Sequence, residues 1–300
     1  GEDVCFLSNS ILQLNSDGSV RANSRISIES GATLLLNGAM TLQSLFDAVR
    51  LQEGSRAVCT QPLRLFGAHG IKLGGELDAA QTDVMVASTL GGLDIAGSTA
   101  ANTLRSRTVD LQIRADTGRA AIGEFHAIVD SDAVVAGGLA VDRVLEMKVA
   151  DRCRFEASSE LFLRQGCSAT VSARRVSGRG DFSHFGLRCD ITGSEHVSLR
   201  HNELLISNAE RAEPALSVQS GGTLRVQPRL LQMDPPAQRD IELPAIVLHS
   251  ARATQVGGDI SASNRRVQCT SDGGVQFRGE LATSMLETHA PFVGQAAGRL

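Results

Sequence analysis

The sequence of 300 residues contains no tryptophan and no tyrosine, and ten phenylalanines are its only large aromatic residues. Large aromatic side chains fill many protein cores, and they stack on bases in single-strand binding sites. A chain of this length without them must build its core from Val, Leu, Ile and Ala. The same absence disfavours a protein that binds single-stranded nucleic acid or grips sugars by stacking.

Lysine is nearly as rare, since Lys72 and Lys148 are the only two. The 29 Lys and Arg residues are spread along the chain and are matched by 33 Asp and Glu, so the net charge is −4. Without a one-faced basic field we expect no nucleic-acid partner. Without a run of 18 apolar residues we expect no transmembrane segment.

Cysteine shows no motif, because no C-x2-C pair occurs and no H-x3-H or HExxH spacing accompanies it. We therefore expect no metal, no cofactor and no catalytic residue of these kinds. The six cysteines are widely and irregularly spaced, and we interpret most of them as small buried apolar residues. For Cys153 and Cys167, a disulfide between neighbouring layers is the alternative.

Short segments of alternating apolar and polar residues dominate the chain. Each lasts three to five residues and ends at Gly, Asn, Asp or Ser, which is typical of short β-strands separated by turns. Examples are Ile26–Ile28, Leu63–Leu65, Ile71–Leu73, Leu93–Ile95, Val109–Ile113, Leu224–Val226 and Val275–Phe277. Two stretches, 41–53 and 139–149, are equally compatible with a short helix and with strands.

Six glycine pairs lead directly into these segments, namely 74–75, 91–92, 137–138, 221–222, 257–258 and 273–274. We interpret the pairs as tight turns that need positive φ angles. Offsets of 17 and 16 residues between some of them suggest a repeat of about 16–20 residues, in the range of stacked β-coils.

Together these features predict an all-β fold, an elongated, β-helix-like β-solenoid of many short strands. Stacked coils have a narrow interior that accepts aliphatic side chains and has no room for Trp or Tyr. The alternative is an intertwined β-fibre to which partner chains contribute strands. We expect solenoid coils over 1–226, a proline-rich loop or insertion over 227–244, further coils over 245–287 and a frayed end over 288–300.

One short motif is legible, the Arg179-Gly180-Asp181 sequence, which follows Gly178. A guanidinium and a carboxylate on either side of a glycine form a cell-attachment candidate that an integrin-type receptor would recognise. An ordinary turn between coils is the structural alternative. His184, His196 and His201 could converge on adjacent coils, and Asp130 and Asp132 could share a strand face or cap a turn.

The turn-and-strand units 31–38 and 221–224, with the Arg-Gly-Asp motif, resemble the haemagglutinin-type passenger domains of secreted bacterial adhesins. The Leu-x-Leu strands are also similar to the sarcoglycan ectodomain, an extended β-fibre. Six cysteines depart from the first family, and the terminal cysteine-rich cluster of the second has no counterpart. Both resemblances imply an extracellular or cell-surface protein.

From these patterns we expect a non-catalytic structural or adhesive solenoid, a rigid shaft or scaffold at a cell surface or in a secreted assembly. Protein partners, or self-assembly through the coil ends, would complete it. One alternative is a carbohydrate-active β-helix enzyme, a lyase or hydrolase. Another is a subunit of a larger filament or multi-chain complex.

Overall fold

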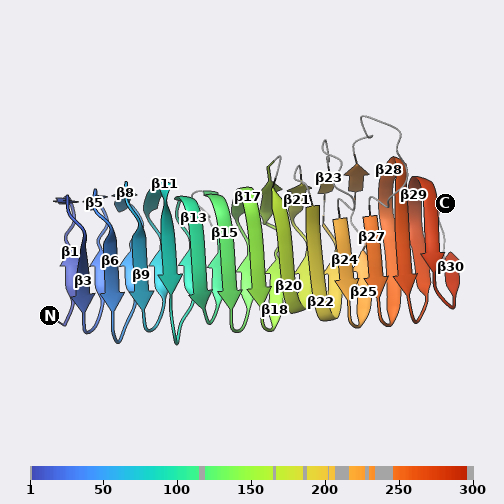
Figure 1. The fold of residues 1–300 in the computed structure, drawn as a ribbon, viewed down its shortest axis with the longest axis horizontal. Coiled ribbons are helices and arrows are strands. Elements are labelled where there is room, and N and C mark those ends of the chain that lie inside the picture. The colour runs from blue at the N-terminus through green and yellow to red at the C-terminus, as the bar shows by residue number, and fades with distance from the viewer. Residues whose placement is uncertain are drawn as a thin grey trace. The chain divides into compact units, whose positions relative to one another are not determined.

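The computed structural model describes residues 2–295, except for 115–118, 165–166, 185–187, 202, 207–215, 227–229 and 234–245. The described residues form 30 β-strands and no helix (Figure 1). Successive strands pair in parallel with strands one coil later, which confirms the all-β solenoid. The chain divides into two compact units, Gly1–Lys148 and Val149–Leu300, which we call unit 1 and unit 2.

Unit 1 contains the first sixteen strands and all but the last residue of the seventeenth. They are β1 (Val4–Phe6), β2 (Ile11–Leu14), β3 (Gly18–Ala22), β4 (Ile26–Ile28), β5 (Thr33–Leu36), β6 (Met40–Ser44), β7 (Val49–Leu51), β8 (Arg56–Cys59), β9 (Leu63–Gly67), β10 (Ile71–Leu73), β11 (Glu76–Ala87), β12 (Leu93–Ile95), β13 (Thr99–Thr108), β14 (Leu111–Ile113), β15 (Arg119–Val129), β16 (Ala133–Val135) and β17 (Gly138–Val149).

Unit 2 contains the remaining strands. They are β18 (Arg152–Phe155), β19 (Glu160–Leu163), β20 (Ser168–Gly178), β21 (Asp181–His184), β22 (Arg188–Leu199), β23 (Glu203–Ile206), β24 (Leu216–Ser220), β25 (Thr223–Val226), β26 (Leu230–Met233), β27 (Ile246–Ser250), β28 (Ala253–Ser271), β29 (Val275–His289) and β30 (Val293–Gln295).

Most coils are longer than the glycine spacing suggested. In unit 1, paired residues of adjacent coils lie 18 to 23 residues apart, as with Leu93 and Leu111 or Met40 and Leu63, and in unit 2 the separation reaches 30. The predicted repeat of 16–20 residues therefore covers only the short end of the observed range, because successive glycine pairs occupy different corners of the coil and their spacing does not measure a whole coil. Gly74–Gly75 lies between β10 and β11, whereas Gly91–Gly92 lies between β11 and β12.

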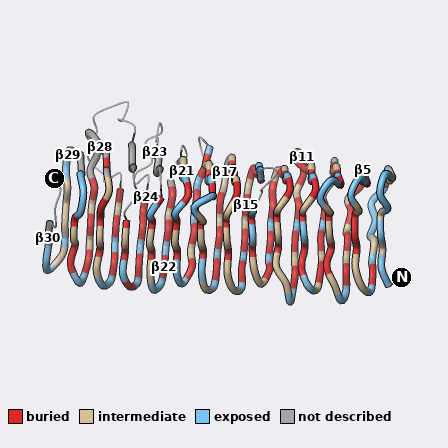
Figure 2. Tube along the Cα trace, turned by 180° about the vertical axis from the view of Figure 1, so that it is seen from behind, coloured by how far each residue is buried: buried red, intermediate tan, exposed pale blue. Residues whose placement is uncertain are grey.

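The core is a set of stacked aliphatic side chains, because every second residue of a strand points inward. Burial alternates along β9 and β10, and Figure 2 shows the same alternation along the coils. Each fully buried Leu or Ile contributes about 1.5–3 kcal/mol relative to an exposed one. The largest fully buried side chains are Phe125, Ile26, Leu34, Leu36, Leu42, Ile71, Leu73, Leu77, Leu93, Ile95, Leu104 and Leu111.

Neither ambiguous stretch is a helix, since β6 (40–44) and β7 (49–51) with a bend between them cover most of the first and β17 (138–149) covers the second. The coils pair within one chain, so partner strands are not needed to build them. Cys153 and Cys167 are buried and are not joined by a disulfide, so the alternative disulfide between them is wrong. Most of the predicted proline-rich segment 227–244 lies outside the described residues.

Most of the glycine pairs serve close packing of backbones, which corrects their interpretation as positive-φ turns. Among the paired glycines that the structure describes, only Gly258 and Gly274 have positive φ. Gly257 and Gly258 lie within β28 and not in a turn. At the pairs 74–75, 91–92 and 221–222, adjacent coils approach so closely that a Cβ would collide with the neighbouring backbone, whereas a Cβ on Gly138 would meet only the side chain of Arg119.

Candidate functional site

The candidate site is a notch in the surface of unit 2, where four successive coils turn a corner. It has a volume of about 430 Å³. The corners between β24 and β25 and between β27 and β28 contribute to it, together with the bends within β20 and β22. Its lining consists of Arg175, Ser194, Glu195, His196, Gly221, Gly222 and Arg252.

The notch exists because the coil that contains Gly221 and Gly222 has no side chains at its corner. A Cβ on Gly221 would lie 2.2 Å from the carbonyl oxygen of Ser194, and one on Gly222 would lie 1.9 Å from that of Glu195. Only glycine fits at such a distance, so the backbones stack in contact. The space above the glycines remains open between the side chains of the preceding coil and Arg252 of the following one.

A buried serine holds the floor of the notch. The hydroxyl of Ser220 donates to the carbonyl oxygen of Thr223 at 3.0 Å and accepts the Gly222 N–H at 3.3 Å. The Arg252 N–H donates to the carbonyl oxygen of Gly222 at 3.0 Å. Because these groups are satisfied within the stack, the glycine backbone is fixed on both sides.

The charges around the notch do not cancel. Glu195 accepts a hydrogen bond from Arg175 Nε at 2.9 Å and forms an ion pair with Arg174 Nε at 3.7 Å. The exposed side chain of Arg252 has no partner among the residues that the structure describes. The lining therefore carries two guanidinium groups against one carboxylate.

His196 stands at the wall of the notch, with Nδ1 2.6 Å from Thr223 Oγ1. Partial burial lowers the pKa of this imidazole, and the positive charges of Arg225, Arg175 and Arg200 lower it further. His196 is accordingly neutral at neutral pH and offers one ring nitrogen as a donor or acceptor.

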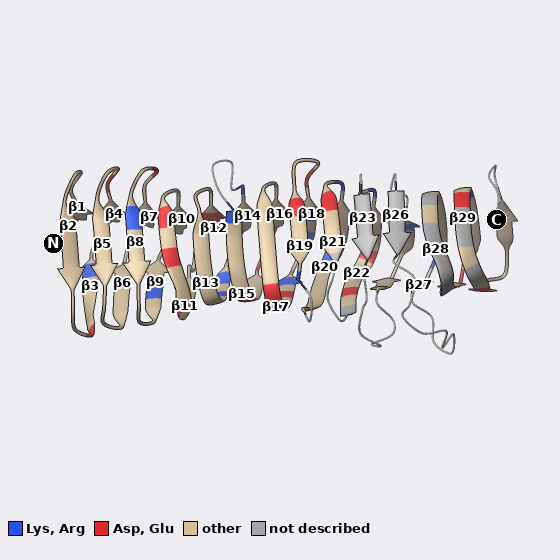
Figure 3. Ribbon diagram, turned by 90° about the horizontal axis from the view of Figure 1, so that it is seen from above, with Lys and Arg blue, Asp and Glu red and all other residues tan. Residues whose placement is uncertain are grey.

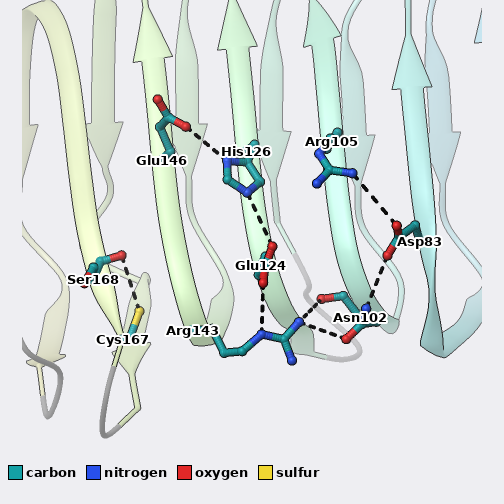
Figure 4. A network of polar contacts seen from close by, with 9 residues as sticks. All are labelled: Asp83, Asn102, Arg105, Glu124, His126, Arg143, Glu146, Cys167 and Ser168. Carbon is teal, nitrogen blue, oxygen red and sulfur yellow. Dashed lines mark hydrogen bonds and ion pairs between the residues drawn. The ribbon is translucent and has the colours of Figure 1, made fainter.

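A second polar cluster lies in unit 1, on the outer face of β11, β13, β15 and β17 (Figure 4). Asn102 Nδ2 donates to Asp83 Oδ1 at 3.2 Å, and Arg143 Nη2 donates to Asn102 Oδ1 at 2.8 Å. Arg143 Nε also donates to Glu124 Oε1 at 3.1 Å. These contacts link four successive coils, so we call the cluster the coil-spanning ladder.

The ladder continues through His126, which Figure 4 shows between two carboxylates. His126 Nδ1 lies 3.0 Å from Glu146 Oε2, and His126 Nε2 lies 3.7 Å from Glu124 Oε2. Hydrogen bonds from Lys148 and then from His126 lower the pKa of Glu146. The ladder's cations and carboxylates thus neutralise one another, as expected for a structural cross-link.

Arg179 and Gly180 form the connection between β20 and β21, and Asp181 is the first residue of β21. Arg179 and Asp181 are exposed, whereas Gly180 is buried. The Arg179 N–H donates to Phe155 O at 3.0 Å and the Asp181 N–H to Ser159 O at 2.8 Å, so the motif belongs to the stack. Its role in cell attachment stays a prediction.

His201 secures the motif from the next coil. This side chain is only 3% exposed, and its Nδ1 donates to the carbonyl oxygen of Gly180 at 2.8 Å. Because a carbonyl only accepts, the proton of the neutral ring is on Nδ1. Burial lowers the pKa of His201, although Gly180 and Asp181 act in the opposite direction.

Of the three predicted histidines, the two whose side chains are described, His196 and His201, do not converge. His196 lines the notch, His201 is buried, and the side chain of His184 lies outside the described residues. Asp130 and Asp132 lie in the turn between β15 and β16, as the turn interpretation predicted.

Sequence reasoning missed both polar sites, although each left a signal. The ladder places Glu124 and His126 at i and i+2 on one strand, and Glu146 and Lys148 on the next. The notch follows from the pair Gly221–Gly222. Neither signal says which residues of other coils complete the site.

Comparisons with known proteins do not assign the chain to a family. Within the described part of the chain, no three His, Cys, Asp or Glu side chains are grouped to hold a metal ion. The same residues contain no helix that is long and apolar enough to cross a membrane. No family model, no curated protein and no solved structure matches the chain.

Proposed function

We propose that the chain is a non-catalytic structural or adhesive β-solenoid that acts as a rigid scaffold at a cell surface or in a secreted assembly. One observation carries the proposal: outward-facing charged side chains of unit 1 pair with those of neighbouring coils. Besides the coil-spanning ladder, Arg56 of β8 contacts Glu76 and Asp78 of β11 at 3.2 and 3.8 Å. Figure 3 shows basic and acidic bands on these adjacent strands.

Such pairs suit a scaffold because they add up along the stack. A single exposed ion pair contributes about 0.2–1 kcal/mol, but a row of them favours one register of the coils over its alternatives. The cavity among the core side chains of unit 1 measures only about 10 Å³, which is at the lower limit of the space that one water molecule needs. Core and surface side chains alike are used to hold the coils together.

Small-angle scattering combined with a mass measurement tests the scaffold role. We expect a rod-like scattering profile, and assembly through the coil ends would add a species whose mass is a multiple of the chain's. A compact, near-spherical particle would contradict the proposal.

The adhesive form of the proposal relies on the exposed side chains of Arg179 and Asp181. Cells bearing integrin-type receptors should attach to a surface coated with the chain. Asp181→Ala should abolish the attachment, and Arg278→Gln, which changes an exposed arginine of β29, should leave it intact. Equal attachment to all three proteins would exclude the motif.

A carbohydrate-active enzyme is the second candidate, and the placement of Glu124, His126 and Glu146 on one face favours it. Carboxylates flanking a proton-transfer group are used in glycoside chemistry. Release of reducing ends from an acidic polysaccharide, lost in Glu146→Gln, would support this candidate. Turnover unchanged by that substitution would exclude this cluster as its site.

A further inference from the structure

We propose that the notch of unit 2 binds a sugar acid, a ligand of monosaccharide size that carries one carboxylate and several hydroxyl groups. This inference goes beyond the scaffold role and does not depend on it. It rests on the volume of the notch, on the excess of guanidinium groups over carboxylates in its lining and on the mixed polar character of its wall.

The volume sets the size of the ligand. Pockets that bind small molecules measure roughly 300–1,000 Å³, and the notch, at about 430 Å³, lies in the lower part of this range. The floor is bare backbone at Gly221 and Gly222, so a ring can approach the main chain directly. A single sugar ring matches this space.

The arginines set the charge of the ligand. Arg252 has no side-chain partner among the described residues, and the only described partner of the Arg175 guanidinium is Glu195, at its Nε. Guanidinium groups present paired N–H donors that match the two oxygens of a carboxylate. An anionic group is therefore expected beside Arg252, whose guanidinium no described carboxylate neutralises.

The other polar residues of the lining indicate which further groups the ligand carries. Glu195 only accepts hydrogen bonds and repels a second anion, whereas a ligand hydroxyl can donate to it. Ser194 can both donate and accept, and the remaining ring nitrogen of neutral His196 offers one donor or one acceptor. A ligand with a single carboxylate and neighbouring hydroxyls satisfies all of these groups, whereas phosphate places extra negative charge against Glu195.

Titration calorimetry of the whole chain with D-glucuronate tests the proposal. We expect measurable binding, and at least about tenfold weaker binding of glucose, acetate and inorganic phosphate, each of which lacks one required feature. Arg252→Gln should weaken glucuronate binding by about tenfold or more, because it removes a charge-assisted contact. The matched control Arg278→Gln, an exposed arginine outside the notch, should bind like the unchanged chain.

A second variant keeps the test independent of any loss of folding. Glu195→Gln should narrow the preference for glucuronate over phosphate, since the repelling carboxylate is gone. Circular dichroism confirms that each variant is folded. The proposal is overturned if glucuronate does not bind, if phosphate binds as tightly, or if Arg252→Gln and Arg278→Gln bind alike.

Discussion

Two glycine corners, Gly91–Gly92 in unit 1 and Gly221–Gly222 in unit 2, share one backbone design. In each, a preceding serine hydroxyl accepts a glycine N–H, from Gly91 to Ser88 at 3.1 Å and from Gly222 to Ser220 at 3.3 Å. In each, a Cβ on the glycine would lie about 2 Å from a carbonyl oxygen of the preceding coil. The tight stacking is therefore a property of the backbone.

The two corners differ in the next coil. Asp110 follows the unit 1 corner, and its short side chain accepts the Asp132 N–H at 3.3 Å, so its charge is used inside the stack. Arg252 follows the unit 2 corner, and its long side chain has no partner among the described residues. The comparison teaches that glycines create the space, while the flanking side chain decides whether it becomes a cross-link or a notch.

The largest effect should come from adding a methyl group at either corner. Gly222→Ala and Gly91→Ala would each force a Cβ against a backbone oxygen, at 1.9 and 2.0 Å, and should lower the free energy of unfolding by about 3 kcal/mol. Urea unfolding followed by far-ultraviolet circular dichroism measures this loss, because the chain has no tryptophan to report by fluorescence.

Gly138→Ala is the matched control. A Cβ there would meet only the side chain of Arg119, at 3.4 Å, and Gly138 does not have a positive φ. The free energy of unfolding should change by less than about 1 kcal/mol, and an increase is as acceptable as a decrease. If Gly222→Ala is as mild as Gly138→Ala, the shared backbone design is wrong.

Acidification should separate the two units. The pKa of His201 is lower in the folded chain than its ordinary 6.5, so the unfolded state binds the proton first. The free energy of unfolding of unit 2 should therefore fall as pH drops below about 6.5, by at most about 1.4 kcal/mol per pH unit for one proton. His196, with its pKa also lowered, acts in the same direction.

Hydrogen exchange of peptides from each unit, compared between about pH 7 and about pH 5.5 after correction for intrinsic exchange, measures this difference. In unit 1, His69 is exposed and His126 is half-buried, whereas His201 of unit 2 is only 3% exposed. His201→Gln should reduce the pH dependence of unit 2. Equal weakening of both units by acid would contradict the assignment to His201.

A smaller effect is expected from the serine hydroxyls. Ser88→Ala and Ser220→Ala each remove the acceptor of a glycine N–H and should cost about 1 kcal/mol. Ser8→Ala, at an exposed position, is the control and should be neutral in the same urea titration. If Ser88→Ala and Ser220→Ala lower the free energy of unfolding by clearly different amounts, the two corners do not share one backbone design.

The smallest effects concern the flanking side chains. Asp110→Ala should cost about 0.5 kcal/mol through the lost hydrogen bond, whereas Arg252→Gln should leave the free energy of unfolding unchanged. Thermal unfolding resolves the sign of the difference. A marked loss of stability in Arg252→Gln would mean that this arginine serves the stack and not a ligand.

Much of the fold could be predicted, because the alternation of inward apolar and outward polar side chains is visible within each short segment of the sequence. Ile71–Leu73 and Leu93–Ile95 were predicted as strands from three residues each, and they pair with one another one coil apart. The missing Trp and Tyr pointed correctly to a narrow aliphatic core, in which Phe125 is the largest of the fully buried side chains.

The coil length and the sites could not be predicted, because they depend on which corners stack. Equal-looking glycine pairs occupy different corners, so their spacing measures a fraction of a coil. The ladder joins Asn102 to Arg143 across 41 residues, and no local pattern specifies that partnership. Likewise, Arg252 reaches the notch only because its coil lies on the glycine coil.

The positions of the cysteines make it possible to detect which of the two units unfolds locally. Cys5 is the one exposed cysteine, while Cys59 lies in the core of unit 1 and Cys153, Cys167, Cys189 and Cys269 lie in that of unit 2. Burial raises the pKa of Cys59 and Cys153 to about 12, which leaves almost no reactive thiolate in the folded chain. A maleimide should therefore mark a native molecule once, and each later modification, mapped by mass spectrometry, would identify which unit had opened.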